Sequence, residues 1–252
     1  MRPSAQMHPH GRGDNVGATM TSYIDVVFAP IDRDLALERV AGGNETEVYR
    51  SDDGRYVAKL KGELGGSLDA ALAQAREMRA AADGFAACLG PSYAIPSHYV
   101  LARENSGRVQ VLVLQPFLCD ARALSALDYR ALTPHERRHL GAHLLTIIRR
   151  AERLYRTTGS MPDLYGRTSS SHAERRRNRS LRNLPRRLWS FLVERTLLRS
   201  HNLMLTNDPA RPVALVDYDF VRRGRLYKRV YFLVRRLLFY RDRVAIRLAL
   251  GA

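Results

Sequence analysis

Two lysines lie close together in a chain that otherwise uses arginine as its basic residue. Arginine and lysine total 41, and the lysines among them are Lys59, Lys61 and Lys228. Side-chain alternation over residues 56–61 predicts a β-strand with Lys59 and Lys61 on one face. A lysine beside apolar residues in a strand needs an anionic partner. We therefore expect Lys59 to bind an anion, with Lys61 as the second candidate; the alternative is an edge-strand lysine that faces water.

Asn202, Asp217 and Asp219 form a second group of candidate residues. Asn202 opens a short apolar segment, Asp217 ends another one 15 residues later, and Asp219 follows. Carboxylate and carboxamide oxygens are hard ligands that suit Mg²⁺ held jointly with phosphates. The alternative is that these residues only form turns at strand ends.

The elements that must position these residues begin with a small sheet and one helix. The Asp53-Gly54 pair between apolar alternations predicts a hairpin turn. A helix is predicted over residues 67–89, ended by Gly90-Pro91. Strands are expected over residues 22–29, 37–40, 47–50, 55–61, 98–103 and 108–114, with a linker at 115–118.

The second half of the chain is predicted to be mainly helical. A helix over residues 134–157 begins after the capping residue Thr133 and runs to Gly159. Further helix is expected over 171–199, short strands over 203–206 and 213–216, and a basic amphipathic helix over about 226–249.

From residue 37 onward, the five strands with a helix inserted after the third, followed by a linker and a helical half, resemble the protein-kinase-like fold. The turn Gly42-Gly43 with Val48 partly matches the kinase glycine-rich turn, although the flanking glycine positions hold Ala41 and Thr46. The resemblance covers about residues 37–220. It implies an α+β, two-lobed fold with a small antiparallel β-sheet N-lobe carrying one helix and a reduced, mainly helical C-lobe.

The same resemblance implies ATP and Mg²⁺ as cofactors and gives the candidate residues their roles. Glu77, mid-helix and 18 residues after Lys59, would pair with Lys59, which bridges the phosphates. Nucleotide contacts are implied for Gly42, Gly43, Val48, Lys59, Gln115 and Phe117, and metal contacts for Asn202, Asp217 and Asp219.

The catalytic aspartate departs from the kinase pattern. It should lie a few residues before Asn202, where this chain has Leu197. Asp163 instead lies in a Pro-Asp-Leu-Tyr-Gly segment similar to the Pro-Asp-Leu-x-Gly of bacterial kinase-like proteins, which runs directly into the asparagine. We therefore interpret residues 167–199 as a basic helical insertion and Asp163 as the base for an attacking hydroxyl. The alternative is a helix-terminating aspartate in a pseudoenzyme.

Size favours a compact kinase that acts on a small molecule, sugar or lipid over a protein kinase. The C-terminal half is small and has no Ala-Pro-Glu motif. Its Val-Asp-Tyr-Asp sequence before an Arg-rich helix is also similar to lipopolysaccharide-core sugar kinases. The expected organisation is a disordered tail at residues 1–20, an N-lobe at 21–118 and a C-lobe at 119–252.

Charge and composition limit the possible partners, the type of chain and the location of the protein. The net charge of +16 comes from residues 167–201 (+8) and 221–252 (+9), while the rest of the chain is close to neutral. These segments could contact an acidic partner, nucleic acid or an acidic membrane surface, or simply be solvated helix. The 45% apolar content excludes a disordered or coiled-coil chain. Two cysteines, with no apolar run or signal peptide, favour a cytoplasmic protein, with peripheral membrane association as a further possibility.

Three functions follow from these patterns. The leading hypothesis is an ATP-dependent phosphotransferase of kinase-like fold. The second is a catalytically inactive pseudokinase that acts as a binding module through its basic segments. The third is a binder of RNA or another phosphate-rich polymer, which would use residues 167–201 and 221–252.

Overall fold

The computed structural model describes residues 24–30, 38–42, 47–51, 54–60, 66–103, 108–166, 195–218 and 225–252. The predicted tail at 1–20 lies outside these residues, as do Gly43, Lys61 and Asp219, and so does the predicted insertion up to residue 194. Within the described residues the predicted α+β class is confirmed, because a small, mostly antiparallel sheet is combined with long helices.

Six strands form the larger sheet, in the order β1-β5-β6-β4-β3-β2. Neighbouring strands are antiparallel except β1 and β5, which run parallel. The predicted strand at 22–29 therefore forms an edge of this sheet. The strands are β1 (Ile24–Pro30), β2 (Glu38–Gly42), β3 (Glu47–Arg50), β4 (Tyr56–Leu60), β5 (His98–Arg103) and β6 (Val109–Pro116).

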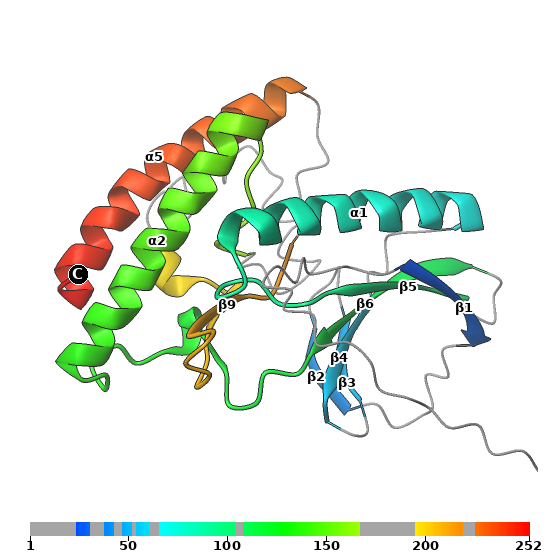
Figure 1. The fold of residues 1–252 in the computed structure, drawn as a ribbon, viewed down its shortest axis with the longest axis horizontal. Helices are drawn as coiled ribbons and strands as arrows, with labels where there is room; N and C mark the ends of the chain where they lie inside the picture. The colour runs from blue at the N-terminus through cyan, green and yellow to red at the C-terminus, as the bar shows by residue number, and fades with distance from the viewer. Residues whose placement is uncertain are drawn as a thin grey trace, which may run out of the picture.

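Helix α1 (Leu68–Leu89) follows β4 in the sequence and lies along β5 and β6 on one side of the larger sheet (Figure 1). Ser67 caps its first turn by accepting a hydrogen bond from the Ala70 N–H, and Gly90 ends it with a positive φ of 81°. Small alanines on its inner face let the helix pack close to the sheet. Its buried residues are Ala71, Ala75, Met78, Ala82, Phe85 and Leu89.

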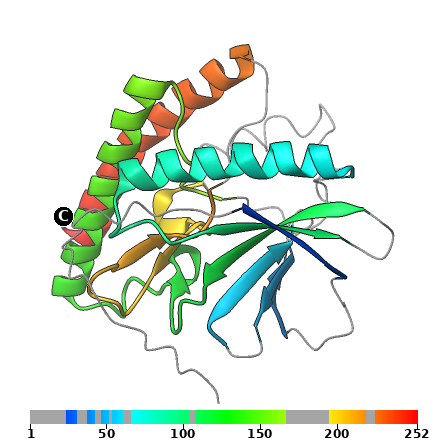
Figure 2. The ribbon, with the colours of Figure 1, turned by 45° about the vertical axis from the view of Figure 1, so that its right-hand side comes forward.

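The second half combines two long helices with a small sheet. The helix α2 (Pro134–Thr158) begins with a capping box between Thr133 and Glu136, and it packs beside α5 (Arg225–Leu250) (Figure 2). The small antiparallel sheet has the order β7-β8-β9. The remaining elements are β7 (Arg122–Ala123), η1 (Leu124–Ala126), η4 (Leu197–Arg199), β8 (Leu203–Leu205) and β9 (Val213–Leu215).

The turn that follows α1 joins the two halves. The Leu215 N–H of β9 donates to the Tyr93 carbonyl at 2.7 Å. The Tyr218 hydroxyl accepts from the Ile95 N–H at 2.7 Å and donates to the Ile95 carbonyl at 3.2 Å. Residues of both halves belong to one buried apolar cluster. The end of β9 is therefore held against the segment that leads into the larger sheet.

We predict that Tyr218→Phe lowers the free energy of unfolding by about 1–3 kcal/mol, because the buried Ile95 N–H loses its acceptor. Urea denaturation measures this change. Tyr56→Phe is the matched control, since Tyr56 is 46% exposed and should tolerate the loss of its hydroxyl. Equal stability of Tyr218→Phe and the wild type would contradict the proposed role of this contact.

Candidate functional site

The strand register places three predicted nucleotide contacts on one face of the larger sheet. Val48 of β3 lies directly opposite Lys59 of β4. Val57, two residues before Lys59, lies opposite Gln115 of β6. Directly opposed residues share a face of the sheet, and so do residues two apart in one strand. Val48, Lys59 and Gln115 therefore point to the same side.

A chain of hydrogen bonds runs from Lys59 to the predicted base. The Lys59 ammonium donates to the Val216 carbonyl at 2.5 Å, across 157 residues of sequence. The Val216 N–H donates to the Asn202 carbonyl at 2.9 Å. The Asn202 side-chain amide donates from Nδ2 to the Asp163 carbonyl at 2.7 Å. Since Asp217 directly follows Val216, four predicted site residues meet at one end of the small sheet.

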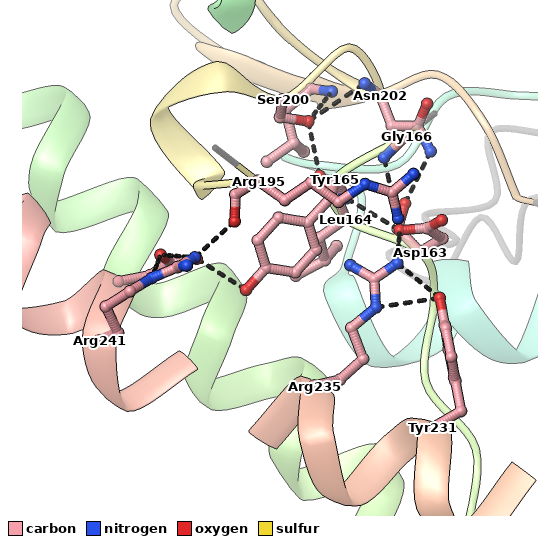
Figure 3. Close-up of polar contacts among 12 residues, drawn as sticks. Asp163, Leu164, Tyr165, Gly166, Arg195, Ser200, Asn202, Tyr231, Arg235 and Arg241 are labelled. Carbon is pink, nitrogen blue, oxygen red and sulfur yellow. Dashed lines mark hydrogen bonds and ion pairs between the residues drawn. The ribbon is translucent and has the colours of Figure 1, made fainter. Parts of the chain in front are cut away.

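The segment after α2 closes back on the segment before β8 (Figure 3). Ser200 is fully buried and donates its hydroxyl to the Leu164 carbonyl at 2.5 Å, while accepting from the Asn202 N–H at 3.1 Å. The His201 N–H donates to the Tyr165 carbonyl at 3.1 Å. The chain that leaves at residue 166 therefore returns to the same place by residue 200.

The Asp163 carboxylate is fixed mainly through one oxygen. Its Oδ1 accepts from the Tyr165 N–H at 3.0 Å, from the Gly166 N–H at 3.4 Å and from Arg235 Nη2 at 2.8 Å. Within the described part of the chain no donor contacts Oδ2, and the Asp163 side chain keeps 20% of its surface exposed. One carboxylate oxygen is thus left for a further partner. The two backbone contacts are also those of a turn-forming aspartate.

Gly166 is required beside this carboxylate for two reasons. Its φ of +73° is in the left-handed region, which favours glycine. A Cβ at this position would also lie 2.6 Å from the Asn202 Oδ1. The glycine of the Pro-Asp-Leu-Tyr-Gly segment therefore makes room for the Asn202 side chain.

Arg235 of α5 is the buried partner of Asp163. Its side chain is 2% exposed and lies between two aromatic rings, with the guanidinium carbon 4.4 Å from the Tyr165 ring centroid and 4.9 Å from that of Tyr231. Its Nε also donates to the Tyr231 hydroxyl at 2.9 Å. Burial alone would lower the pKa of Arg235, but Asp163 and the tyrosines raise it. The guanidinium therefore stays charged.

A second polar contact ties α5 to the same segment. Asp242 is 1% exposed and accepts from the Tyr165 hydroxyl at 2.7 Å and from the Leu197 N–H at 3.1 Å. Arg241 donates to the other Asp242 oxygen at 2.7 Å. Burial raises the pKa of Asp242, although these donors act to lower it. Helix α5 thus holds Tyr165 at its ring, through Arg235, and at its hydroxyl, through Asp242.

The predicted pairing of Glu77 with Lys59 is not found. Glu77 is exposed on α1 and makes no ion pair or hydrogen bond with another residue of the described chain. The reason is helical phase, because Ala75 and Met78 occupy the inner face of α1 and turn Glu77 toward solvent. Lys59 is instead held by the backbone at the end of β9.

The predicted linker at residues 115–118, which carries two of the implied nucleotide contacts, is already partly hydrogen bonded. Gln115 is 2% exposed and donates to the Ser97 hydroxyl at 2.8 Å, and its Oε1 accepts no hydrogen bond in the described part of the chain. The Phe117 N–H donates to the Arg55 carbonyl at 2.7 Å. Gly42 ends β2 opposite Glu47, and the predicted turn that follows lies outside the described residues.

The donor set suits a cation that shares its ligands with phosphates. Among the described residues, no three His, Cys, Asp or Glu side chains are grouped to hold a metal ion by themselves. Because Asn202 donates through Nδ2, its oxygen Oδ1 is the atom left for a cation. Oδ1 and the Asp217 carboxylate are both hard oxygen donors, the class of ligand that Mg²⁺ prefers.

Sequence reasoning missed three residues that shape this site, namely Ser200, Arg235 and Asp242. Two of them carried a detectable signal. Asp242 is the sole acidic residue within 221–252, and Arg235 lies seven residues, about two helical turns, before it. A single acidic residue in a basic helix indicates a specific contact for that residue. In the structure, Asp242 and Arg235 are both on the buried face of α5.

In comparisons with known proteins, no protein-family model matches the chain, and no curated protein matches its sequence.

We predict strong energetic coupling between Arg235 and Asp163. Arg235→Met should lower the free energy of unfolding by about 3 kcal/mol, because it leaves Asp163 with an uncompensated charge beside apolar surroundings. The double variant Arg235→Met/Asp163→Asn should recover part of this loss in urea denaturation. Arg247→Met, at an exposed position of the same helix, is the control. If Asp163→Asn changes stability equally with and without Arg235, the ion pair has no stabilising role.

Proposed function

We propose that this protein is an ATP-dependent phosphotransferase with a two-lobed, protein-kinase-like fold. The observation that carries the proposal is the hydrogen-bond chain from Lys59 through Val216 and Asn202 to Asp163. This chain brings together residues from distant parts of the sequence, among them a lysine, an asparagine and an aspartate, with Asp217 next to Val216. These are the groups that phosphoryl transfer uses for charge neutralisation and positioning.

Lys59 is the group that would contact the nucleotide phosphates. Its ammonium carries three protons, and its bond to the Val216 carbonyl keeps it beside Asp217. Bound MgATP would supply the phosphoryl group and the cation that neutralises it. Asn202 Oδ1 and the Asp217 carboxylate would hold that cation, with Asp219 as a further ligand outside the described residues.

Asp163 is the group that would orient the acceptor hydroxyl. Arg235 and two backbone N–H groups hold one of its oxygens, so the carboxylate has a fixed orientation. A loose phosphoryl-transfer transition state requires little proton removal before the bond breaks, so orientation by a fixed carboxylate is sufficient. Oδ1 is held by the protein, and Oδ2 is the oxygen that would meet the hydroxyl.

The proposed acceptor is a small molecule, a sugar or a lipid. The support for this class is size, because the C-terminal half has 134 residues from Cys119 onward, fewer than the helical lobe of a full protein kinase. The acceptor would reach Asp163 beside α5, because this helix supplies Arg235.

A nucleotide-binding pseudokinase is the second candidate, and two observations favour it. Glu77 does not pair with Lys59, and the Asp163 carboxylate is engaged by Arg235 and by two backbone N–H groups. Such a protein would bind MgATP without transferring its phosphoryl group.

We predict that MgATP raises the melting temperature by about 5–10 °C at a ligand concentration about a hundredfold above Kd. Lys59→Ala and Asp217→Ala should each abolish this shift, because they remove a phosphate contact and a metal ligand. Lys228→Ala is the matched control, since Lys228 is exposed on α5. A wild-type protein whose melting temperature does not respond to MgATP would overturn both candidates.

We predict that Asp163→Asn lowers phosphoryl transfer at least about 100-fold while keeping the MgATP-induced thermal shift. Phosphate release from MgATP without added acceptor is the basal assay. Asp83→Asn, at an exposed ion pair on α1, is the control. Unchanged phosphate release in Asp163→Asn would refute the assignment of the base. A thermal shift without any phosphate release in the wild type would identify the pseudokinase.

A further inference from the structure

Helix α5 has an apolar face that packs against the rest of the protein. Arg235 and Asp242 are on this buried face together with the apolar residues. The face contacts α2 and the segment before β8. Its buried apolar residues are Phe232, Leu238, Phe239, Ile246 and Leu250. These contacts account for one side of the helix only.

A second apolar face of α5 points away from the protein. Seven large apolar residues recur every three or four positions, which places them along one line of the helix. Each is more than half exposed, from 54% at Leu233 to 83% at Leu248. At 1.5 Å per residue the line is about 33 Å long. We call it the outer stripe: Leu226, Val230, Leu233, Leu237, Tyr240, Val244 and Leu248.

A contiguous apolar line of this length needs an explanation, because isolated exposed apolar residues are ordinary but continuous ones mark interaction surfaces. A helix that only packs against α2 needs one apolar face. The same helix carries a second face on its other side, which the packing of the described core does not use.

Arginines border the outer stripe. Arg229, Arg236 and Arg247 each lie three residues after a stripe residue, along one edge. Arg241 lies near the other edge. The only acidic residue of α5 is Asp242, which is buried. The exposed side of this helix is therefore apolar along its centre and positively charged beside it, with no acidic residue.

We propose that the outer stripe docks α5 onto an anionic membrane surface, with the helix axis in the plane of the membrane. Apolar side chains would enter the boundary between headgroups and acyl chains, and the bordering arginines would contact anionic headgroups. None of the described helices is apolar over enough length to cross a bilayer. The geometry is that of a helix lying on the surface.

Charge favours an anionic membrane over a second copy of the chain as the partner of the outer stripe. Two outer stripes packed together would bring two rows of arginines side by side with no acidic residue of α5 exposed to offset them. Like charges beside an apolar seam oppose pairing. An anionic bilayer offers opposite charge along the full length of the helix.

Docking of the outer stripe would leave the candidate site accessible. Arg235 is 2% exposed, while Leu233 and Leu237 on either side of it are 54% and 60% exposed. Arg235 therefore points inward, toward Asp163, from the opposite side of the helix. The membrane proposal does not depend on the proposed phosphotransferase activity.

Co-sedimentation of the full chain with vesicles tests the proposal. Binding is expected to phosphatidylcholine vesicles that contain about a third phosphatidylglycerol, and weak or no binding to pure phosphatidylcholine. Leu233→Glu/Leu237→Glu should lower partitioning by about tenfold or more. The matched control is Ala73→Glu/Ala80→Glu, which makes the same charge change at exposed positions of α1 and should bind like the wild type.

A second pair of variants tests the arginines without touching the stripe. Arg229→Gln and Arg247→Gln should each lower binding to anionic vesicles by about fivefold, with the difference disappearing at high salt. Circular dichroism and melting temperature check that every variant is folded.

Two outcomes would overturn the proposal. One is an absence of binding of the wild type to anionic vesicles at low ionic strength, or equally strong binding of the wild type and of the Leu233→Glu/Leu237→Glu variant. The other is a wild-type dimer without vesicle affinity that the same double variant converts to a monomer in sedimentation velocity, which would assign the stripe to a second copy.

Discussion

The Lys59 contact to the Val216 carbonyl is the constraint on which the candidate site depends. Lys59 belongs to the larger sheet, and Val216 lies at the end of the small sheet. Together with the contacts of Leu215 to Tyr93 and of Tyr218 to Ile95, this bond holds the end of the small sheet against the first half of the chain, at the point where Asp217 begins. The Val216 N–H in turn holds Asn202, and Asn202 holds the carbonyl of Asp163. Loss of the Lys59 contact would separate the Lys59 ammonium from the residues that we propose as metal ligands.

Besides this hydrogen-bond chain, the C-terminal helix α5 also fixes side chains of the candidate site. Arg235 fixes the Asp163 carboxylate, and Asp242 fixes Tyr165 two residues later. The turn at Asp163 is therefore positioned by α5 and not by its own short sequence alone. The opposite side of α5 is the proposed membrane-docking surface. One helix would therefore serve both the location of the protein and the geometry of its candidate base, through two separate faces.

Much of the fold could be predicted because its signals are local. The Thr133 cap and Gly159 gave the start and end of α2 almost to the residue, and Gly90 ended α1 as expected. Contacts between distant segments were harder to predict from the sequence. The Pro-Asp-Leu-Tyr-Gly segment located the turn at Asp163, but Arg235 lies 72 residues further on and resembles its many neighbouring arginines. The predicted pairing of Glu77 with Lys59 is not found because the spacing of two residues along the sequence does not fix the direction in which a helical side chain points. Alanine and methionine occupy the inner positions of α1 around Glu77.

The most direct test of the central claim is a crystal structure of the protein with Mg²⁺ and a non-hydrolysable ATP analogue. Our account predicts phosphate density within contact of the Lys59 ammonium and a cation between the Asn202 side-chain oxygen and the Asp217 carboxylate, with the γ-phosphate facing Asp163. Nucleotide bound away from the Lys59–Val216 contact, or crystals that stay free of nucleotide at saturating concentration, would contradict it.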